Sequence, residues 1–278
     1  MAWFHRKKSA RQWGVGLSQQ AVHLVSDDGQ LTRFDCQGPA HWPALLATLP
    51  VQPQDQVHLV LPHSELSSLS VDKPATEPLT EELFWALKDA VPIPPQDLQF
   101  DYYDLPAQPI GRERVNVVCA SKKLLSGICQ AVPAEVVSIG NEEMSLRHLF
   151  SAGEGGRPVL VLNLNGDGDL LLAIYHQGML YFSRWLQGYR LNQDELDPYI
   201  LAERLSLDIQ RALDYLESQL RQPPAERILL ALSELLDSSL APLLSDTFSV
   251  PVLPLDDFLE QRCADWAALG ALRGGHEA

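Results

Sequence analysis

Residues 21–34, AVHLVSDDGQLTRF, and residues 170–182, LLLAIYHQGMLYF, share one pattern that decides the predicted fold. In each stretch an apolar run is followed by polar residues and a glycine, and then by a second run with an early Leu and a Phe. A glycine turn between two such runs is typical of a β-hairpin. Because the unit occurs in both halves of the chain, it predicts an internal duplication.

The sequence around each hairpin extends the repeat. A further apolar strand precedes the hairpin, and a helix and another strand follow it. We expect these elements at 14–18, 41–48 and 57–61 in the first copy, and at 159–164, 197–220 and 228–232 in the second. Another helix, a short strand at 250–253 and a last helix from Phe258 to Gly270 or just beyond complete the chain. Strands that alternate with helices predict an α/β fold.

The segment at about 64–134 has a different character. Thr80 and the two glutamates after it predict the start of a helix, and Pro92 predicts its end. Two strands, at 98–105 and 114–120, and a helix at 123–130 are expected next. The sequence therefore predicts a basic tail at 1–12, a first half at 13–153 that contains this α+β insert, and a second half at 154–278.

Composition excludes several classes of protein. The chain has 278 residues, of which 46% are hydrophobic and 21% charged, and it contains no apolar run long enough to span a bilayer. A net charge of −15 disfavours a general role in nucleic-acid binding. The four cysteines are scattered, which indicates a reduced, cytosolic protein. No metal site is expected, because the calcium-like run that starts at Asn163 has Ile174 where a glutamate is required.

The first residues combine aromatic and basic side chains. We consider membrane contact through Trp3, Phe4, Arg6, Lys7, Lys8 and Arg11. Each basic residue near an anionic surface contributes about 1 kcal/mol, so such binding would be weak and reversible. A solvated tail is the alternative.

Three segments resemble PilM-like pilus assembly proteins of the actin superfamily, most closely the MshI branch of the mannose-sensitive haemagglutinin (MSHA) type IV pilus system. They are ALKDAVPIPPQDLQFDYY at 86–103, LDIQRALDY at 207–215 and AALGALR at 267–273. The resemblance implies a duplicated actin-like (RNase H-like) fold with an inserted α+β subdomain. It also implies a cytoplasmic protein, peripheral to the inner membrane, that binds the cytoplasmic tail of a PilN-like bitopic membrane protein. Other pilus platform proteins and the assembly ATPase are further partners that it suggests.

Members of this family with intact phosphate loops bind ATP between the two halves, but this chain departs from their pattern. Gly16 and Ser18 stand where Asp and Gly are expected, and Gln19 follows them. In the second loop Asn163 and Asn165 replace Asp and Gly, and Asn165-Gly166 is typical of a type I′ turn. Ser233-Glu234-Leu235 stands where Ser-Gly-Gly would leave room for adenine.

We therefore predict a degenerate nucleotide site, no catalytic residue and no cofactor; Mg²⁺ and ATP are the disfavoured alternative. Glu234 would bring negative charge toward a triphosphate, and Leu235 would bring bulk into the base pocket. Asp167 and Asp169 lie close enough that a shifted hairpin could still present a carboxylate.

The predicted function is a non-catalytic scaffold of the pilus assembly platform. Within the aromatic insert, Trp85 and Tyr103 are the residues that we expect to be exposed in a groove for the partner peptide. An active actin-like ATPase of pilus biogenesis is one alternative. The cytoplasmic domain of a type II secretion platform protein is another, although that domain normally continues into a transmembrane helix.

Overall fold

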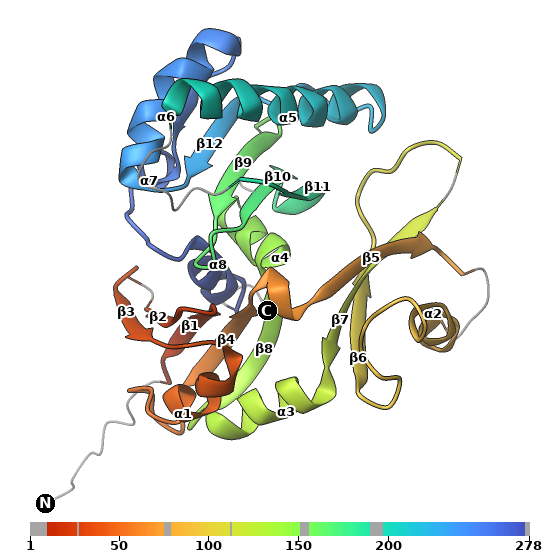
Figure 1. Ribbon diagram of the computed structural model, residues 1–278, viewed down its shortest axis with the longest axis vertical. Helices are drawn as coiled ribbons and strands as arrows, with labels where there is room; N and C mark the ends of the chain where they lie inside the picture. Colours follow the sequence, from red (N-terminus) through yellow and green to blue (C-terminus); the bar gives the residue numbers. More distant parts are fainter. Residues whose placement is uncertain are drawn as a thin grey trace, which may run out of the picture.

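The described part of the chain forms two five-stranded sheets and one three-stranded sheet (Figure 1). The structure, a computed structural model, describes residues 10–26, 28–74, 79–111, 113–150, 156–189 and 197–275. Within these residues, no helix has the length and apolar character that crossing a membrane requires.

The two large sheets have the same topology. The first has the order β3-β2-β1-β4-β8, and the second has the order β11-β10-β9-β12-β13. In both, the first three strands are antiparallel and the last three are parallel. The predicted duplication is therefore confirmed. The strands are β1 Gln12–Leu17, β2 Ala21–Val25, β3 Leu31–Asp35, β4 Gln56–Leu61, β8 Glu135–Asn141, β9 Val159–Leu164, β10 Leu170–His176, β11 Met179–Leu186, β12 Arg227–Ala231 and β13 Val252–Pro254.

Helices cover both faces of each large sheet. The helices α1 (Trp42–Leu46) and α3 (Lys122–Ala131) pack on the outer face of the first sheet, while α5 (Pro198–Ser218) and α6 (Glu234–Thr247) pack on the outer face of the second. Between the sheets lie α4 (Glu142–Leu146) and α8 (Trp266–Gly275), as Figure 1 shows. The short helices are η1 Pro39–His41, η2 His63–Glu65, η3 Arg147–Leu149 and α7 Leu255–Leu259.

The alternation of side chains along the strands explains these layers. In β9, Leu160 and Leu162 belong to the core under α5 and α6, whereas Val159 and Val161 belong to the core between the sheets. All four are buried, as expected of a strand whose two faces are both covered. Burial on both faces gives β9 a continuous apolar run.

Close backbone contacts attach α8 to the first half. A Cβ atom at Gly14 of β1 would lie 2.1 Å from the carbonyl oxygen of Ala268, and a Cβ atom at Gly270 of α8 would lie 2.2 Å from that of Ser145. Glycine is required at both positions because backbone occupies the space of a side chain. The last helix of the chain therefore packs directly on its first strand.

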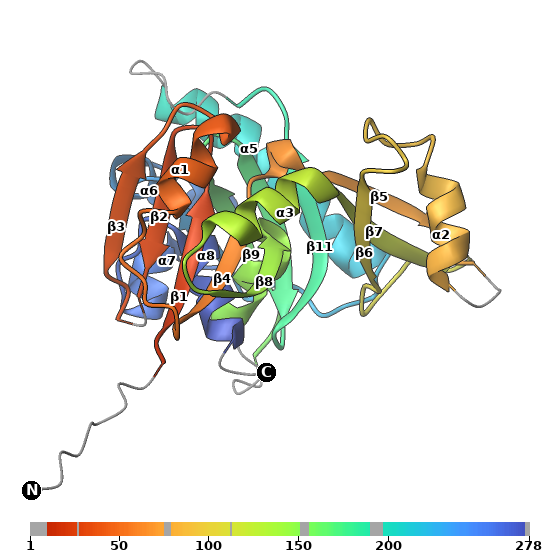
Figure 2. The same cartoon turned by 90° about the horizontal axis from the view of Figure 1, so that it is seen from below.

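The insert forms the third sheet, in the order β5-β7-β6, and extends away from the two large sheets (Figure 2). Its strands are β5 Ser67–Asp72, β6 Leu98–Tyr103 and β7 Arg114–Ser121. The helix α2 (Leu79–Leu87) covers the face that carries Phe100 and Tyr102. The helix α3, which we expected to close the insert, packs on the first sheet instead through Ile128 and Val132.

Four further features differ from the expectations. The strands β5 and β8 and the five-residue helix α4 were not predicted. The last helix was predicted to run without a break from Phe258, but it is interrupted between α7 and α8. The interruption follows from Glu260, whose φ of 51° lies in the left-handed region and ends α7.

Candidate functional site

A cleft of about 340 Å³, here called the central cleft, lies between the two halves. It forms where the parallel strands of both sheets end, which is the usual position of a binding site in an open α/β sheet. It is lined by residues 16–18, 163–166, 231–234 and 263–267, and by His23, Val60, Glu142, Asp237 and Asp256.

The structure brings together most of the residues that we assigned to the former nucleotide loops. Gln19 lies beside the central cleft rather than in its lining, and its side chain donates to Ser64 and Glu65. The positions that line the central cleft are Gly16, Ser18, Asn163, Asn165, Gly166, Ser233 and Glu234.

Ser18 stabilises the turn between β1 and β2, which is the first of the former phosphate loops. Its Oγ accepts a hydrogen bond from the backbone N–H of Ala21 at 2.9 Å, and Trp42 Nε1 donates to its carbonyl oxygen at 2.9 Å. The side chain is buried and its hydrogen bonds are local. Ser18 therefore acts as a turn residue, in which the hydroxyl replaces a backbone partner.

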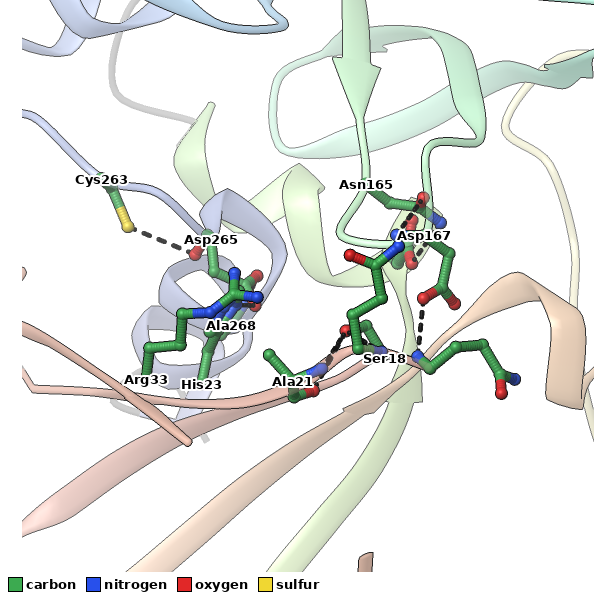
Figure 3. Close-up of polar contacts among 12 residues, drawn as sticks. Ser18, Ala21, His23, Arg33, Asn165, Asp167, Cys263, Asp265 and Ala268 are labelled. Carbon is green, nitrogen blue, oxygen red and sulfur yellow. Dashed lines mark hydrogen bonds and ion pairs between the residues drawn. The ribbon is translucent and has the colours of Figure 1, made fainter. Parts of the chain in front are cut away.

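A direct hydrogen bond joins the turn between β1 and β2 to the turn between β9 and β10. The backbone N–H of Gln19 donates to Asp167 Oδ1 at 2.6 Å, across 148 positions of sequence (Figure 3). The Oδ1 atom of Asn165 accepts from the N–H groups of Asp167 and Asp169, which fixes the second turn. Burial raises the pKa of Asp167. Phosphate loops direct backbone N–H groups at a bound anion. Here such an N–H group, that of Gln19, already donates to a carboxyl group of the protein itself.

The side chain of Asp265 lies against Gly16 of β1, beside the turn between β1 and β2. A Cβ atom at Gly16 would lie 1.9 Å from Asp265 Oδ2, and His23 Nδ1 lies 2.9 Å from the same oxygen (Figure 3). The other oxygen accepts from the N–H of Ala268 and so caps α8. Asp265 was not predicted as a cleft residue. An Asp three positions before Ala268 was the available signal, but it indicates only a helix start.

The central cleft is acidic. Its lining includes Glu142, Glu234, Asp237, Asp256 and Asp265, and none of its described lining residues is Lys or Arg. Burial raises the pKa of Glu142 well above its ordinary value and that of Asp237 to about 7. A triphosphate requires cationic or N–H groups around its oxygens, so these residues do not fit it.

The end of β12 differs in part from the expectation. Ser233 caps α6 by accepting from the N–H of Leu236, and Glu234 lines the central cleft, with Arg262 3.8 Å away at the exposed rim. Leu235 was expected to fill a base pocket. That expectation is wrong, because its side chain is 76% exposed and does not line the central cleft.

A second concave region, here called the insert groove, lies on the face of the insert sheet opposite α2. It consists of two hollows that share Tyr103. One, of about 390 Å³, lies against Ile139 and Gly140 of the edge strand β8. The other, of about 280 Å³, lies against β11, where Trp185 stacks on His63 with ring centroids 4.4 Å apart.

The two aromatic residues that we assigned to a partner groove do not lie together. Tyr103 lines both hollows of the insert groove, and burial raises its pKa. Trp85 is 58% exposed on α2, which covers the other face of the sheet. A single groove therefore contains only Tyr103 of this pair.

Of the residues considered for membrane contact, Trp3, Phe4, Arg6, Lys7 and Lys8 lie outside the described residues. Arg11 is exposed immediately before β1, and its backbone N–H donates to Asp55 at 3.1 Å. Among the described residues, no group of three or more acidic, His or Cys side chains is placed to hold a metal ion.

No protein-family model and no curated protein sequence matches this chain. Solved structures do. A PilM-PilN type IV pilus biogenesis complex is similar over 96% of this chain and 99% of that chain, with a TM-score of 0.64 and 17% identity. A Bacteroides thetaiotaomicron protein with an actin-like ATPase fold and unknown function is similar over 99% of this chain and 99% of that chain, with a TM-score of 0.57 and 12% identity.

The chain has an actin-like fold. The actin-like fold that the resemblance implied is therefore confirmed. The cytoplasmic domain of EpsL from the type II secretion system of Vibrio cholerae is also similar, with 16% identity over 86% of this chain and 96% of that chain. Its TM-score of 0.47 is too low to support an inference. The actin-like fold is shared by proteins with different activities, so function has to be argued from the sites.

Proposed function

We propose that this actin-like protein is a non-catalytic scaffold of a type IV pilus assembly platform of the MSHA type, in the manner of MshI. In this proposal it lies in the cytoplasm at the inner membrane and binds the cytoplasmic tail of a PilN-like bitopic protein. Other platform proteins and the assembly ATPase are further proposed partners. The fold that it shares with the PilM-PilN complex supports the proposal.

The observation that carries the non-catalytic part is the hydrogen bond between Gln19 and Asp167. In an actin-like nucleotide site, backbone N–H groups of two facing hairpins bind the phosphates. Here one of these groups already has a carboxylate partner from the facing hairpin, at 2.6 Å. An incoming phosphate would have to displace that partner and enter a lining rich in acidic side chains, which disfavours ATP on electrostatic grounds.

The insert groove supports the scaffold part. Its two hollows extend along the sheet face from the free edge of β8 to β11, and Tyr103 lies where they meet. Aromatic side chains in concave surfaces contribute strongly to peptide binding. The exposed polar residues Gln99 and Asp101 of β6 lie on the same face. This mixture of one aromatic anchor and polar neighbours suits a short extended peptide better than a second globular protein.

Calorimetric titration tests the proposed partner. The full chain is titrated with a synthetic peptide of the cytoplasmic tail of the PilN-like protein from the same organism. We expect 1:1 binding that Tyr103→Ala weakens at least tenfold, because the substitution removes the anchor of the insert groove. Trp85→Ala is the matched control, since Trp85 lies on the other side of the insert, and it should leave the dissociation constant unchanged.

A second variant separates binding from folding. Gln99 is exposed, so Gln99→Arg should leave the fold intact while placing a longer side chain in the insert groove. Circular dichroism verifies that each variant is folded. Tight binding by both groove variants, or loss of binding on Trp85→Ala alone, would contradict the assignment of this groove to the partner.

A further inference from the structure

Glu142 is the most unusual side chain of the central cleft. It follows β8 directly, at the first position of α4, and only 6% of its surface is exposed. Its Oε1 atom accepts a hydrogen bond from Asn165 Nδ2 at 3.1 Å, whereas its buried Oε2 atom has no hydrogen-bond partner among the residues that the structure describes. An unpaired buried carboxyl oxygen is unfavourable, so its presence indicates a missing partner.

Other acidic groups around the central cleft also favour a partner with donors and positive charge. Asp237 and Asp256 line it from α6 and α7, and Asp265 lines it from the connection before α8. The basic side chains nearby already have acidic partners: His23 contacts Asp265, Arg33 contacts Asp35, and Arg262 contacts Glu234 at the exposed rim. A ligand in the central cleft would therefore meet an excess of carboxyl groups.

We propose that the central cleft binds a small aliphatic amine, whose ammonium group donates to Glu142 Oε2 in a lining that also carries Asp237, Asp256 and Asp265. The volume of about 340 Å³ lies within the range of small-molecule sites. Asn163 and Ser233 supply additional acceptors in the lining. The site goes beyond the proposed scaffold function and does not depend on the insert groove.

An amine fits this site better than a divalent metal ion. A metal ion requires several oxygens that converge within about 2.0–2.6 Å of one point. Among the described residues no such group of three is present. An ammonium group has three donors but needs no complete coordination shell, so it can donate to one carboxyl group of the lining and to water.

Thermal unfolding and calorimetric titration of the full chain test the proposal. The probes are spermidine and putrescine, with MgCl₂ and NaCl at matched ionic strength. We expect the amines to raise the melting temperature in a dose-dependent way, since a ligand at about 100 times its dissociation constant adds roughly 2.7 kcal/mol to stability. The matched salts should give a clearly smaller shift.

Substitutions locate the binding. Glu142→Gln keeps an acceptor for Asn165 but removes the carboxylate, and we expect it to weaken amine binding at least tenfold. Asp237→Asn is a second variant at the opposite wall and should also weaken binding. Glu217→Gln removes an equal charge from an exposed position on α5 and should have no effect. Binding of the PilN-like peptide should be unaffected by all three.

Proton release gives an independent readout. Glu142 faces Asn165, Glu143, Asp167 and Asp265, and burial together with these carboxyl groups raises its pKa. An ammonium group beside it favours the charged form, so binding should release a proton, which titrations in buffers of different ionisation enthalpy measure. Absence of an amine-specific shift, an equal shift with Mg²⁺, or unchanged binding by Glu142→Gln would each overturn the proposal.

Discussion

At single positions, the burial of acidic side chains sets the chemistry of the central cleft. Asp237 illustrates the effect, because burial raises the pKa of its carboxyl group to about 7 even though the group accepts a hydrogen bond from the N–H of Leu232. Buried charge is unfavourable unless it is paired, and the shift in pKa is the thermodynamic measure of that penalty. Stability should therefore depend on pH through this residue.

Asp237→Asn tests this penalty. Burial raises the pKa of Asp237 in the native state to about 7, whereas the unfolded chain has the ordinary value of 3.8. Between these values the native state holds more protons than the unfolded state, so stability falls as pH rises and is constant above about pH 7. The Asn variant lacks the penalty. Urea denaturation should show it more stable by on the order of 1–3 kcal/mol at pH 8, and equal to the wild type below pH 4.

Trp185→Phe tests a contact between the halves. Trp185 Nε1 donates to the buried Glu143 at 2.8 Å, and the ring stacks on His63. Phe keeps an aromatic ring but leaves the carboxylate without this donor, so we expect a loss of about 1–3 kcal/mol in the free energy of unfolding. Trp85→Phe at the exposed position on α2 is the control and should change stability by less than about 0.5 kcal/mol. Equal effects of both substitutions would contradict the prediction.

At the scale of elements, hydrophobic periodicity predicted the helices and strands that bury a regular apolar face. The hairpins at 21–34 and 170–182 and the apolar stripe of α5 were correct because each buries a regular face. The strand β5 was missed because SSLSVD contains only two apolar residues, although its burial alternates. The strand β8 was missed because it is an edge strand with an irregular burial pattern. Short elements with few apolar residues or with an irregular apolar face give a weak signal of this kind.

The packing of α8 reverses the usual effect of a helical glycine. Intrinsic helix propensity favours Gly→Ala by up to about 1 kcal/mol. Gly127 in α3 has open space around its Cβ position, so Gly127→Ala should stabilise the protein. Gly270→Ala should instead destabilise it by about 2–3 kcal/mol, because the added methyl group would overlap the backbone of α4. Thermal unfolding of both variants distinguishes these effects, and stabilisation by Gly270→Ala would show that α8 can move away from α4.

At the scale of the whole molecule, the sequence predicted which loops meet but not what fills the space between them. The positions from Gly16 to Glu234 could be placed by their likeness to phosphate loops, and most of them line one cleft. Glu142 and Asp265 could not, since they lie on unpredicted or misplaced elements and reach the central cleft only through tertiary packing. Long-range contacts of this kind leave no local pattern.

Millimolar Mg²⁺ and ATP should leave the melting temperature unchanged. The occupied N–H of Gln19 and the acidic lining are the physical reasons. A bound ligand at 100 times its dissociation constant would add roughly 2.7 kcal/mol and raise the melting temperature by several degrees. Such a rise would contradict the scaffold proposal and favour an ATP-gated adaptor.

The position of α8 has a consequence for biosynthesis. The inner face of the first sheet, which begins at Gln12, is covered by a helix that begins at Trp266. Ribosomes add about 5–20 residues per second, so the first half of the nascent chain waits on the order of ten seconds for its last packing partner. During that interval the inner face of the first sheet stays open to water.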